Sequence, residues 1–219
     1  MDFVTLASGA LDVASVLTWA GESTIKVVTL YDQTGNGEHL TQSNDSLRPA
    51  FEVPYGVVFS GTGQERLGLA DWHGEADIAQ PWSISSVARH WDLTNGYMPV
   101  LAAHGTNFAG LYFGGDDDTF NLYAAGDHRG GTAVDGEAYN MLAVANGSSS
   151  AFYVDGVEAF TTNAGTAPLY SASLLLGNDA LTGNAQLDGA VFEAGIWGSA
   201  LTASNAAALA NNQSTFWGV

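Results

Sequence analysis

The sequence contains no cysteine among its 219 residues. It can therefore form neither a disulfide framework nor a thiolate metal site. Basic residues are scarce as well: 5 lysine and arginine residues face 23 aspartate and glutamate residues, and the formal net charge is -18. A surface of this sign repels nucleic acid and anionic lipid. The charge balance favours a cation, a neutral glycan or another protein as the partner, and it also suits solubility in a salty medium.

Long apolar segments are also missing. No uninterrupted run of about 18 apolar residues occurs, which argues against insertion into a membrane. The first residues include Asp2 and lack the basic segment with which a secretory signal peptide begins. No signal peptide is therefore expected.

Apolar and aromatic residues, in contrast, are plentiful. Hydrophobic residues make up 46% of the chain, with 6 Trp, 8 Tyr and 10 Phe, which excludes disorder, while 27 Gly indicate many turns. Chains of this length often form one β-sandwich with a sizeable core. We expect residues 1–219 to form a single domain.

The apolar residues alternate in short segments separated by turn signals about every ten residues. Helical spacing occurs at 11–20, before the first strand. No strands alternate with long helices, so the pattern predicts an all-β sandwich rather than a parallel α/β sheet. The predicted strands of this part are 25–31, 57–59, 67–69, 82–88, 97–103, 108–113, 120–125 and 140–145.

The last third of the sequence gives the strongest local signals. Asp155-Gly156 separates two alternating runs, which predicts a hairpin with a type I′ turn because glycine accepts a positive φ. A long strand is predicted at 187–197, followed by a short closing helix that begins at Thr202.

This order of elements resembles the C-terminal half of laminin-G-like domains, in the concanavalin A-like lectin and glucanase group. The resemblance implies an antiparallel jelly-roll β-sandwich with one or two short helices. It is specific for a fold and not for a function. The residues that carry it are Tyr153, Val154, Asp155, Gly156, Leu176, Gly177, Asp188, Gly189, Glu193, Trp197, Leu201 and Thr202.

A second resemblance lies near the N-terminus. The stretch Tyr31-Asp32-Gln33-Thr34-Gly35-Asn36-Gly37 is similar to a signature of the catalytic domain of α-L-arabinofuranosidase B and of related phage proteins. That family implies a Glu nucleophile, an acidic partner and a vicinal disulfide, and the disulfide is impossible here. Asp and Asn side chains bond neighbouring backbone in tight turns, so we interpret Asp32 and Asn36 as parts of a structural loop.

Two patterns favour a bound ligand. Asp116 and Asp118 lie in an acidic turn between predicted strands, where alternate carboxylates and a carbonyl oxygen suit calcium. The alternative is a solvated turn that prevents pairing at a sheet edge. Trp72-His73 and Trp91-Asp92 lie in polar surroundings, where rings can stack on sugars and polar groups can bind hydroxyls. The alternative for any tryptophan is burial in the core, which we assign to Trp82 and Trp197.

Catalytic patterns are weak. Retaining glycosidases of this group place carboxylates at alternate positions of one strand, and no such acid-x-acid-x-x-acid strand occurs. Glu193 lies in the middle of a predicted strand, and we interpret it as structural, bonded to neighbouring backbone or an arginine. A Gly-x-Ser-x-Gly elbow and a phosphate loop are also absent from the sequence.

The sequence therefore favours a non-catalytic recognition or structural module, with calcium as a possible cofactor. Its expected partner is a glycan or a surface or virion protein, its expected location is a virion or another extracellular surface, and a homo-oligomer is possible. One alternative is a glycoside hydrolase acting on arabinose-containing polysaccharide. The other is a purely architectural viral capsid decoration protein. An enzyme would need two converging carboxylates in a cleft, a lectin exposed rings beside polar groups, and an architectural protein a large apolar patch.

Overall fold

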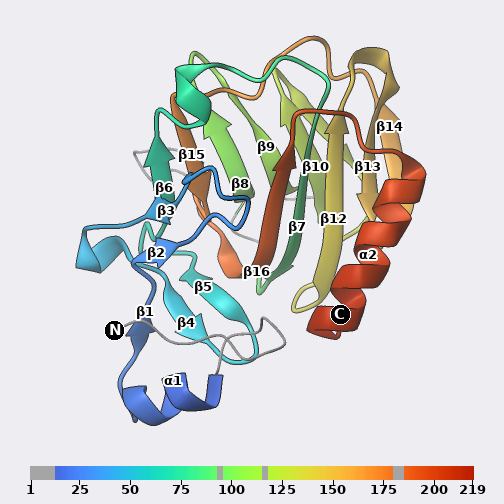
Figure 1. The fold of residues 1–219 in the computed structure, drawn as a ribbon. Helices are drawn as coiled ribbons and strands as arrows, with labels where there is room; N and C mark the ends of the chain where they lie inside the picture. The colour runs from blue at the N-terminus through green and yellow to red at the C-terminus, as the bar shows by residue number, and fades with distance from the viewer. Residues whose placement is uncertain (1–12, 93–95, 115–117, 180–184) are drawn as a thin grey trace.

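The computed structural model describes residues 13–92, 96–114, 118–179 and 185–219. Two antiparallel eight-stranded sheets pack face to face in a sandwich (Figure 1), which confirms the predicted all-β jelly-roll class. The first sheet orders its strands as β1 (Ile25–Lys26), β4 (Ala50–Glu52), β5 (Gly56–Ser60), β16 (Asp188–Trp197), β7 (Trp82–His90), β12 (Ala138–Ala145), β13 (Ser150–Val154) and β14 (Val157–Thr162). The second orders β11 (Asp127–Gly130), β10 (Thr119–Ala124), β9 (Phe108–Gly114), β8 (Met98–His104), β15 (Ser173–Leu176), β6 (Leu67–Ala70), β3 (Leu40–Thr41) and β2 (Thr29–Leu30).

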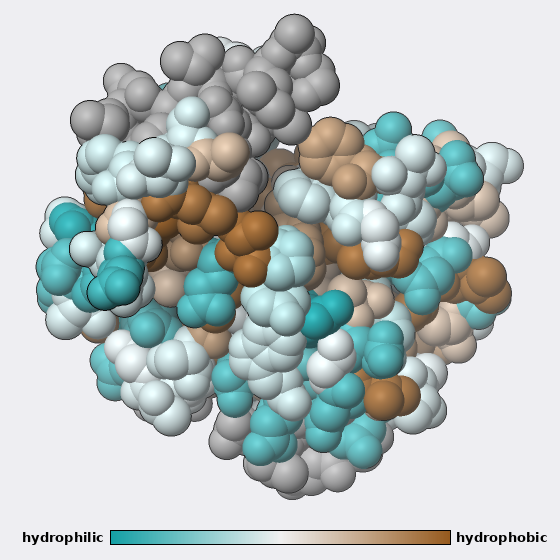
Figure 2. Space-filling model, turned by 90° about the horizontal axis from the view of Figure 1, so that it is seen from below, coloured by the Kyte–Doolittle hydropathy of each residue, from teal (hydrophilic) through white to brown (hydrophobic). Residues whose placement is uncertain are grey.

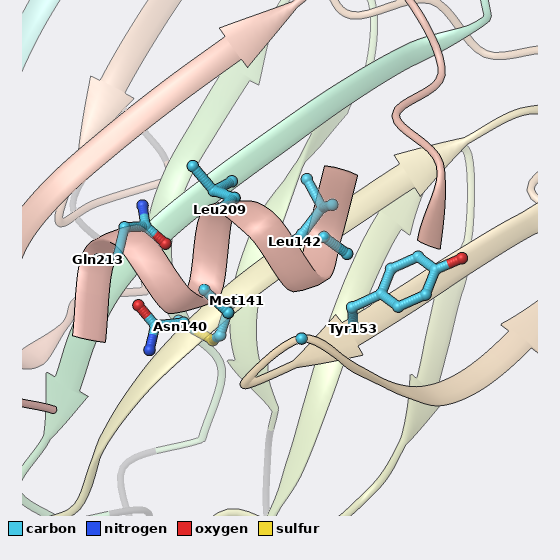
Figure 3. Close-up of a pocket in the computed structure, with 9 residues that line it drawn as sticks. Asn140, Met141, Leu142, Tyr153, Leu209 and Gln213 are labelled. Atoms are coloured by element: carbon cyan, nitrogen blue, oxygen red, sulfur yellow. The ribbon is translucent and has the colours of Figure 1, made fainter. Parts of the chain in front are cut away.

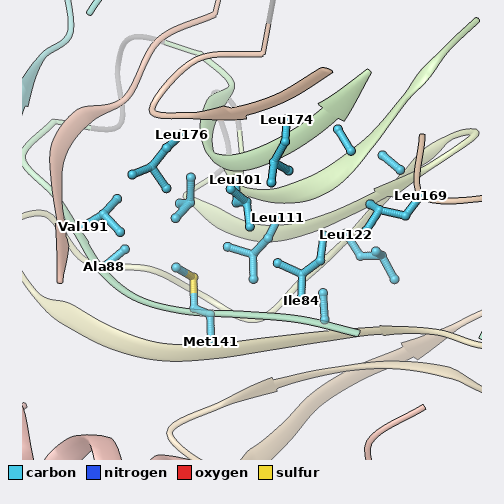
Figure 4. Packing of buried hydrophobic residues seen from close by; sticks show 14 of the residues in the cluster. Ile84, Ala88, Leu101, Leu111, Leu122, Met141, Leu169, Leu174, Leu176 and Val191 are labelled. Atoms are coloured by element: carbon cyan, nitrogen blue, oxygen red, sulfur yellow. The ribbon is translucent and has the colours of Figure 1, made fainter. Parts of the chain in front are cut away.

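The core lies between the two sheets. Strand alternation turns Ile84 and Met141 of the first sheet toward Leu101, Leu111 and Leu122 of the second (Figure 4). All five side chains are at most 2% exposed. Burial of a side chain of this size contributes about 1.5–3 kcal/mol, so a core of this kind holds the sheets together.

The predicted hairpin forms between β13 and β14. Asp155 and Gly156 have φ values of 50° and 78°, so both residues of the turn are left-handed, as a type I′ turn requires. The Asp155 carboxylate accepts a hydrogen bond from the backbone N–H of Asn140 at 3.0 Å. The turn is thereby fixed to the neighbouring strand β12.

The predicted closing helix is α2 (Ala203–Trp217), and at 15 residues it is longer than expected. Thr202 and Asn205 cap it reciprocally: the Asn205 N–H donates to the Thr202 hydroxyl, and the Thr202 N–H donates to the Asn205 side chain. The helix lies on the outer face of the first sheet (Figure 1), where Ala206 packs in a cluster with Leu142, Val144, Ala151 and Tyr153. A water-sized space of about 10 Å³ lies under it (Figure 3).

The predicted single strand at 25–31 is wrong. Its first part is β1 in the first sheet and its second part is β2 in the second, because the chain crosses between the sheets at Val27 and Val28. The Val27 N–H donates to the carbonyl of Pro49, just before β4 of the first sheet. The Val28 carbonyl accepts from the N–H of Gln42, just after β3 of the second sheet. The short strands β3, β4 and β11 were not predicted, since two to four residues are too few for a clear alternation.

A short helix, α1 (Val13–Ala20), occupies the position predicted for one and extends at the lower end of the sandwich (Figure 1). Val16 is buried, whereas Leu17 and Trp19 are 47% and 55% exposed. The view from below shows hydrophobic residues gathered beside hydrophilic ones at this end (Figure 2). Neither helix among the described residues has the length and hydrophobicity to cross a bilayer.

Candidate functional site

The outer face of the second sheet carries side chains unlike those of the core. In β9 and β10, Leu111 and Leu122 point into the core, so alternation turns Tyr112 and Tyr123 outward. The strand register aligns an outward row across the sheet. In order from β6 to β11, this row consists of Gly68, Leu175, Ala102, Gly110, Tyr123 and Asp127.

Small residues in the middle of this row leave little side-chain volume above the sheet. A Cβ atom added at Gly110 would lie 2.5 Å from the Leu101 carbonyl oxygen, and one added at Gly68 would lie 2.8 Å from Cδ2 of Leu175. A hollow of about 430 Å³ opens at the β6 end, within the size range of ligand sites. It is lined by Thr41, Gln42, Arg66, Gly68, Leu69, Ala70, His104, Gly105, Ala172, Ser173 and Leu175.

Aromatic rings continue from the hollow along β9 and β10. The Phe108 ring lies 5.3 Å from the His104 ring and 4.5 Å from the Tyr123 ring, and Tyr123 lies 6.1 Å from Tyr112. Phe108, His104 and Tyr123 are half-buried, whereas Tyr112 is 1% exposed. Such rings offer apolar surface, and the His104, Tyr112 and Tyr123 side chains add polar atoms. We call the hollow and these four rings together the outer-face site.

Three buried polar atoms of this region have no hydrogen-bond partner within the described residues: the Tyr112 hydroxyl, Oδ1 of Asn121 and Nε2 of His104. Asn121 stands opposite Tyr112 in the register and His104 stands opposite Phe108, so all three side chains lie on the same face. A buried polar atom left unpaired costs about 1–3 kcal/mol. Hydroxyl groups of a ligand would remove that cost.

The two titratable groups among these atoms are uncharged at neutral pH. Burial lowers the pKa of His104. Burial raises the pKa of Tyr112 well above its usual value, and the Asp179 carboxylate and Tyr123 add to this shift. A neutral imidazole and a phenol can each donate and accept a hydrogen bond, so they suit a neutral polar ligand. Burial also raises the pKa of Asp179 itself to about 6.

A polar network borders the rings at β11. The Asp127 carboxylate accepts hydrogen bonds from the Tyr97 hydroxyl at 2.6 Å, from Nε of Arg129 at 2.5 Å and from Nδ2 of Asn121. The Arg129 guanidinium lies over the Tyr97 ring at 4.7 Å and also donates to the Tyr97 hydroxyl. Three donors, one of them the Arg129 cation, hold Asp127 as a paired carboxylate, which suits a positioning role better than nucleophilic attack.

The structure corrects the expected surroundings of Trp72. Its indole is 5% exposed, and its Nε1 donates to the Tyr170 carbonyl at 2.7 Å, so the ring has no free face for a sugar. The His73 ring contacts the Ala76 carbonyl at 2.9 Å, and its backbone N–H donates to Glu38. This pair fastens the loop after β6.

Trp91 and Asp92 follow β7 in the other sheet, and no contact joins them to Trp72 and His73 within the described part of the chain. Trp91 is half-buried and meets Tyr55 edge to face at 5.1 Å. The four residues expected to bind glycan therefore do not form one site.

The calcium prediction falls partly on undescribed residues. Asp116 lies outside the described ranges. Asp118 is exposed and left-handed, with a φ of 50°. The described residues contain no group of three or more His, Asp or Glu side chains that could hold a metal ion. Calcium stays a prediction.

The loop after β2 is held by its own side chains. The Asp32 carboxylate accepts from the hydroxyl and the N–H of Thr34, at 2.7 and 2.8 Å, and from the N–H of Glu38 at 3.3 Å. These bonds, with the Thr34 hydroxyl foremost, lower the pKa of Asp32 to about 2. Gln33 donates to the Tyr31 carbonyl, and the Asn36 N–H donates to the Thr34 hydroxyl.

The carboxylate in the middle of β16, Glu193, has structural partners. Glu193 accepts from Nε1 of Trp217 at 2.9 Å and from Gln213 at 3.3 Å, so it ties α2 to the sheet. The expected backbone or arginine partner is thus replaced by two helix side chains. Burial raises the pKa of Asp188, and Asp92 and Glu65 add to this rise.

The outer-face residues were missed at the level of sequence. The signal was present in part: Phe108, Gly110 and Tyr112 alternate with core residues, as do Asn121 and Tyr123. The partner strands β6 and β15, however, come from distant parts of the chain. Their place in the order β9, β8, β15, β6 follows only from the strand pairing of the fold.

The family described as the concanavalin A-like lectin/glucanases superfamily, in its laminin-G-like form, matches residues 79–207, more than half of the chain. The chain belongs to this superfamily. A search of curated protein sequences gives no match.

Solved structures share the fold. Domain 4 of the extracellular arabinanase AbnA from Geobacillus stearothermophilus, solved with arabinotriose, has a TM-score of 0.62 and 20% identity, covering 86% of this chain and 100% of that domain. A Trypanosoma rangeli sialidase has a TM-score of 0.58 and 16% identity, and the match covers 91% of this chain and 39% of the sialidase. A Bacteroides ovatus protein described as carbohydrate-binding has a TM-score of 0.56 and 11% identity, and the match covers 65% of this chain and 44% of that protein. At these identities the likeness shows the fold alone.

Proposed function

We propose that this superfamily member is a non-catalytic glycan-recognition module that binds neutral sugar units at the outer-face site. The observation that carries the proposal is the set of three unpaired buried polar atoms, on Tyr112, Asn121 and His104, beside the Phe108 and Tyr123 rings. Rings can stack on the apolar face of a sugar while unpaired donors and acceptors bind its hydroxyls.

The net charge supports a neutral ligand. At -18, the protein repels dense anions, and the uncharged Tyr112 and His104 place no opposite charge in the site. The superfamily and the structural neighbours, which include an arabinanase domain and a protein described as carbohydrate-binding, are consistent with a glycan partner. An extracellular or virion surface, with calcium as an auxiliary ion, is the setting that we propose for this binding.

The test is retention on a panel of insoluble arabinan, arabinoxylan and bacterial surface glycans, with released reducing ends measured in the same samples. We expect retention without sugar release. Tyr112→Phe removes one hydroxyl from the site, and we expect it to weaken retention about tenfold. Tyr153→Phe is the matched control, because Tyr153 is a buried tyrosine under α2 on the other sheet.

Two outcomes would reject the proposal. Sugar release that is lost when a carboxylate is mutated would establish a glycoside hydrolase instead. Absence of both retention and release across the panel would favour an architectural protein that binds only protein.

A further inference from the structure

A second group of side chains lies away from the outer-face site, at the end of β7. Ala88 and His90 point into the core, so Arg89 between them points to the outer side of the first sheet. Its guanidinium carbon lies 5.1 Å from the Tyr55 ring centre and 5.5 Å from the Trp91 ring centre. The two rings meet edge to face at 5.1 Å, so the cation and both rings form one compact cluster.

Arg89 differs from the other basic residues in its partners. Lys26 and Arg48 pair with Asp45, Arg129 pairs with Asp127, and Arg66 donates to the Gln64 carbonyl. Within the described residues, the Arg89 guanidinium makes no hydrogen bond or ion pair, and its Nε is buried without a partner. One of the few cations of a strongly acidic protein is therefore left uncompensated.

The ring contacts occupy none of the N–H donors of Arg89. A cation over an aromatic ring is attracted by the π electrons and uses no N–H group in that contact. The planar guanidinium presents pairs of N–H donors whose spacing fits a carboxylate in two parallel hydrogen bonds. The rings restrict the side chain in advance, which lowers the entropy lost when a ligand binds.

We propose that Arg89, Tyr55 and Trp91 form a subsite for a carboxylate-bearing sugar, namely a single uronate unit in an otherwise neutral glycan. The guanidinium binds the carboxylate, and the rings supply apolar surface beside the sugar. The net charge of -18 disfavours dense polyanions, so an isolated carboxylate suits the site better. The subsite stands on its own contacts and does not depend on the outer-face site.

Acidic side chains near the subsite do not neutralise Arg89. Asp92 and Asp188 lie on the same end of the sheet, where the Asp92 carboxylate and Glu65 add to the effect of burial in raising the pKa of Asp188. No ion pair joins either carboxylate to Arg89 in the part of the chain that the structure describes. These acids discriminate against ligands with several negative charges.

The test is isothermal titration calorimetry with xylotriose that carries one glucuronate branch. The control ligand is the same oligosaccharide with its carboxyl group reduced to an alcohol. We expect the acid to bind at least tenfold more tightly than the reduced form. Arg89→Gln should abolish this difference, and Arg89→Lys, which keeps the charge but loses the planar fork, should reduce it. Lys26→Gln removes one positive charge elsewhere and should leave it unchanged.

Equal affinity for the acid and the reduced sugar would overturn the proposal, as would full affinity in Arg89→Gln or no binding of either sugar. If Arg89→Gln fails to fold, the Arg89→Lys and Trp91→Phe variants carry the same test. A peptide with a free C-terminal carboxylate is the last arm. Binding of that peptide without binding of the glucuronate sugar would reassign the subsite to a protein partner.

Discussion

The two outer faces of the sandwich follow the same strand alternation but present opposite side chains. On the first sheet, Leu142 and Val144 point outward and need cover, which α2 supplies through Ala206. On the second sheet, the outward positions of β9 and β10 hold glycine, aromatic and polar side chains, including Tyr112 and Tyr123. The outward apolar residues of the first sheet are thus covered by a helix, whereas the rings of Phe108, Tyr123 and His104 on the second sheet stay half-buried and keep part of their surface exposed. Four changes test this contrast.

The largest expected effect concerns the covered face. Ala206 is 2% exposed between α2 and the sheet, so Ala206→Glu buries a charge without a partner. We expect the free energy of unfolding to fall by about 3 kcal/mol or more, measured by urea denaturation. Ala208→Glu, on the exposed side of the same helix, is the control. Similar losses in both variants would show that helix propensity, rather than packing, governs this face.

On the outer face of the second sheet, Gly110→Ala adds a methyl group to the outward row. The new Cβ would lie 2.5 Å from the Leu101 carbonyl oxygen, so the backbone must shift. We expect unfolding free energy to fall by about 1–3 kcal/mol and glycan retention to fall with it. Gly126→Ala meets only His128 at 3.8 Å and serves as the control. Unchanged retention in a folded Gly110→Ala protein would place the ligand elsewhere.

The half-buried carboxyl group of Asp179, whose charge adds to the raised pKa of Tyr112, gives a pH-dependent prediction. The pKa of Asp179 is about 6 in the folded protein against 3.8 ordinarily, so the folded state binds more protons between these values. Stability should therefore fall as pH rises from about 4 to about 6. We expect a loss of about 1–2 kcal/mol, since partial exposure reduces the full effect.

Urea unfolding of the wild type and of Asp179→Asn at pH 4 and pH 7 measures this loss. The Asn variant should lack that part of the pH dependence. A pH dependence that is identical in both proteins would contradict the assignment.

The smallest expected effect concerns the anchor of α2. Glu193→Gln leaves one amide oxygen where two carboxylate oxygens now accept bonds from Trp217 and Gln213. We expect a loss of about 0.5–1.5 kcal/mol in unfolding free energy. Glu52→Gln, at an exposed position of β4, is the control. No difference between the two variants would show that packing alone holds the helix.

Local signals in the sequence predicted the covered face well. The Asp155-Gly156 turn and the Thr202 cap depend on neighbouring residues only, so their geometry followed from sequence. The strand at 25–31 failed because pairing with two different sheets, rather than alternation, determines where it breaks. The burial of Trp72 was not expected, because its polar sequence neighbours gave no sign of Tyr170, the distant residue whose carbonyl it meets.

The outer-face site depends on pairings that local patterns do not contain. Gly68, Leu175, Ala102 and Gly110 come from four strands spread over more than one hundred residues, and only the register brings them into one row. No single one of these residues differs from an ordinary strand residue in a way that would indicate a site. The same holds for Arg89, whose ring partner Tyr55 lies in a separate hairpin.

The most direct test of the central claim is hydroxyl-radical footprinting of the protein with and without the glycan that the panel retains best. The half-buried rings of Phe108, Tyr123 and His104 should lose reactivity when that glycan is bound. Phe216 and Trp19, which are 58% and 55% exposed elsewhere, should keep theirs. Protection of Phe216 or Trp19 with unchanged reactivity at Phe108 and Tyr123 would contradict a binding site on the outer face of the second sheet.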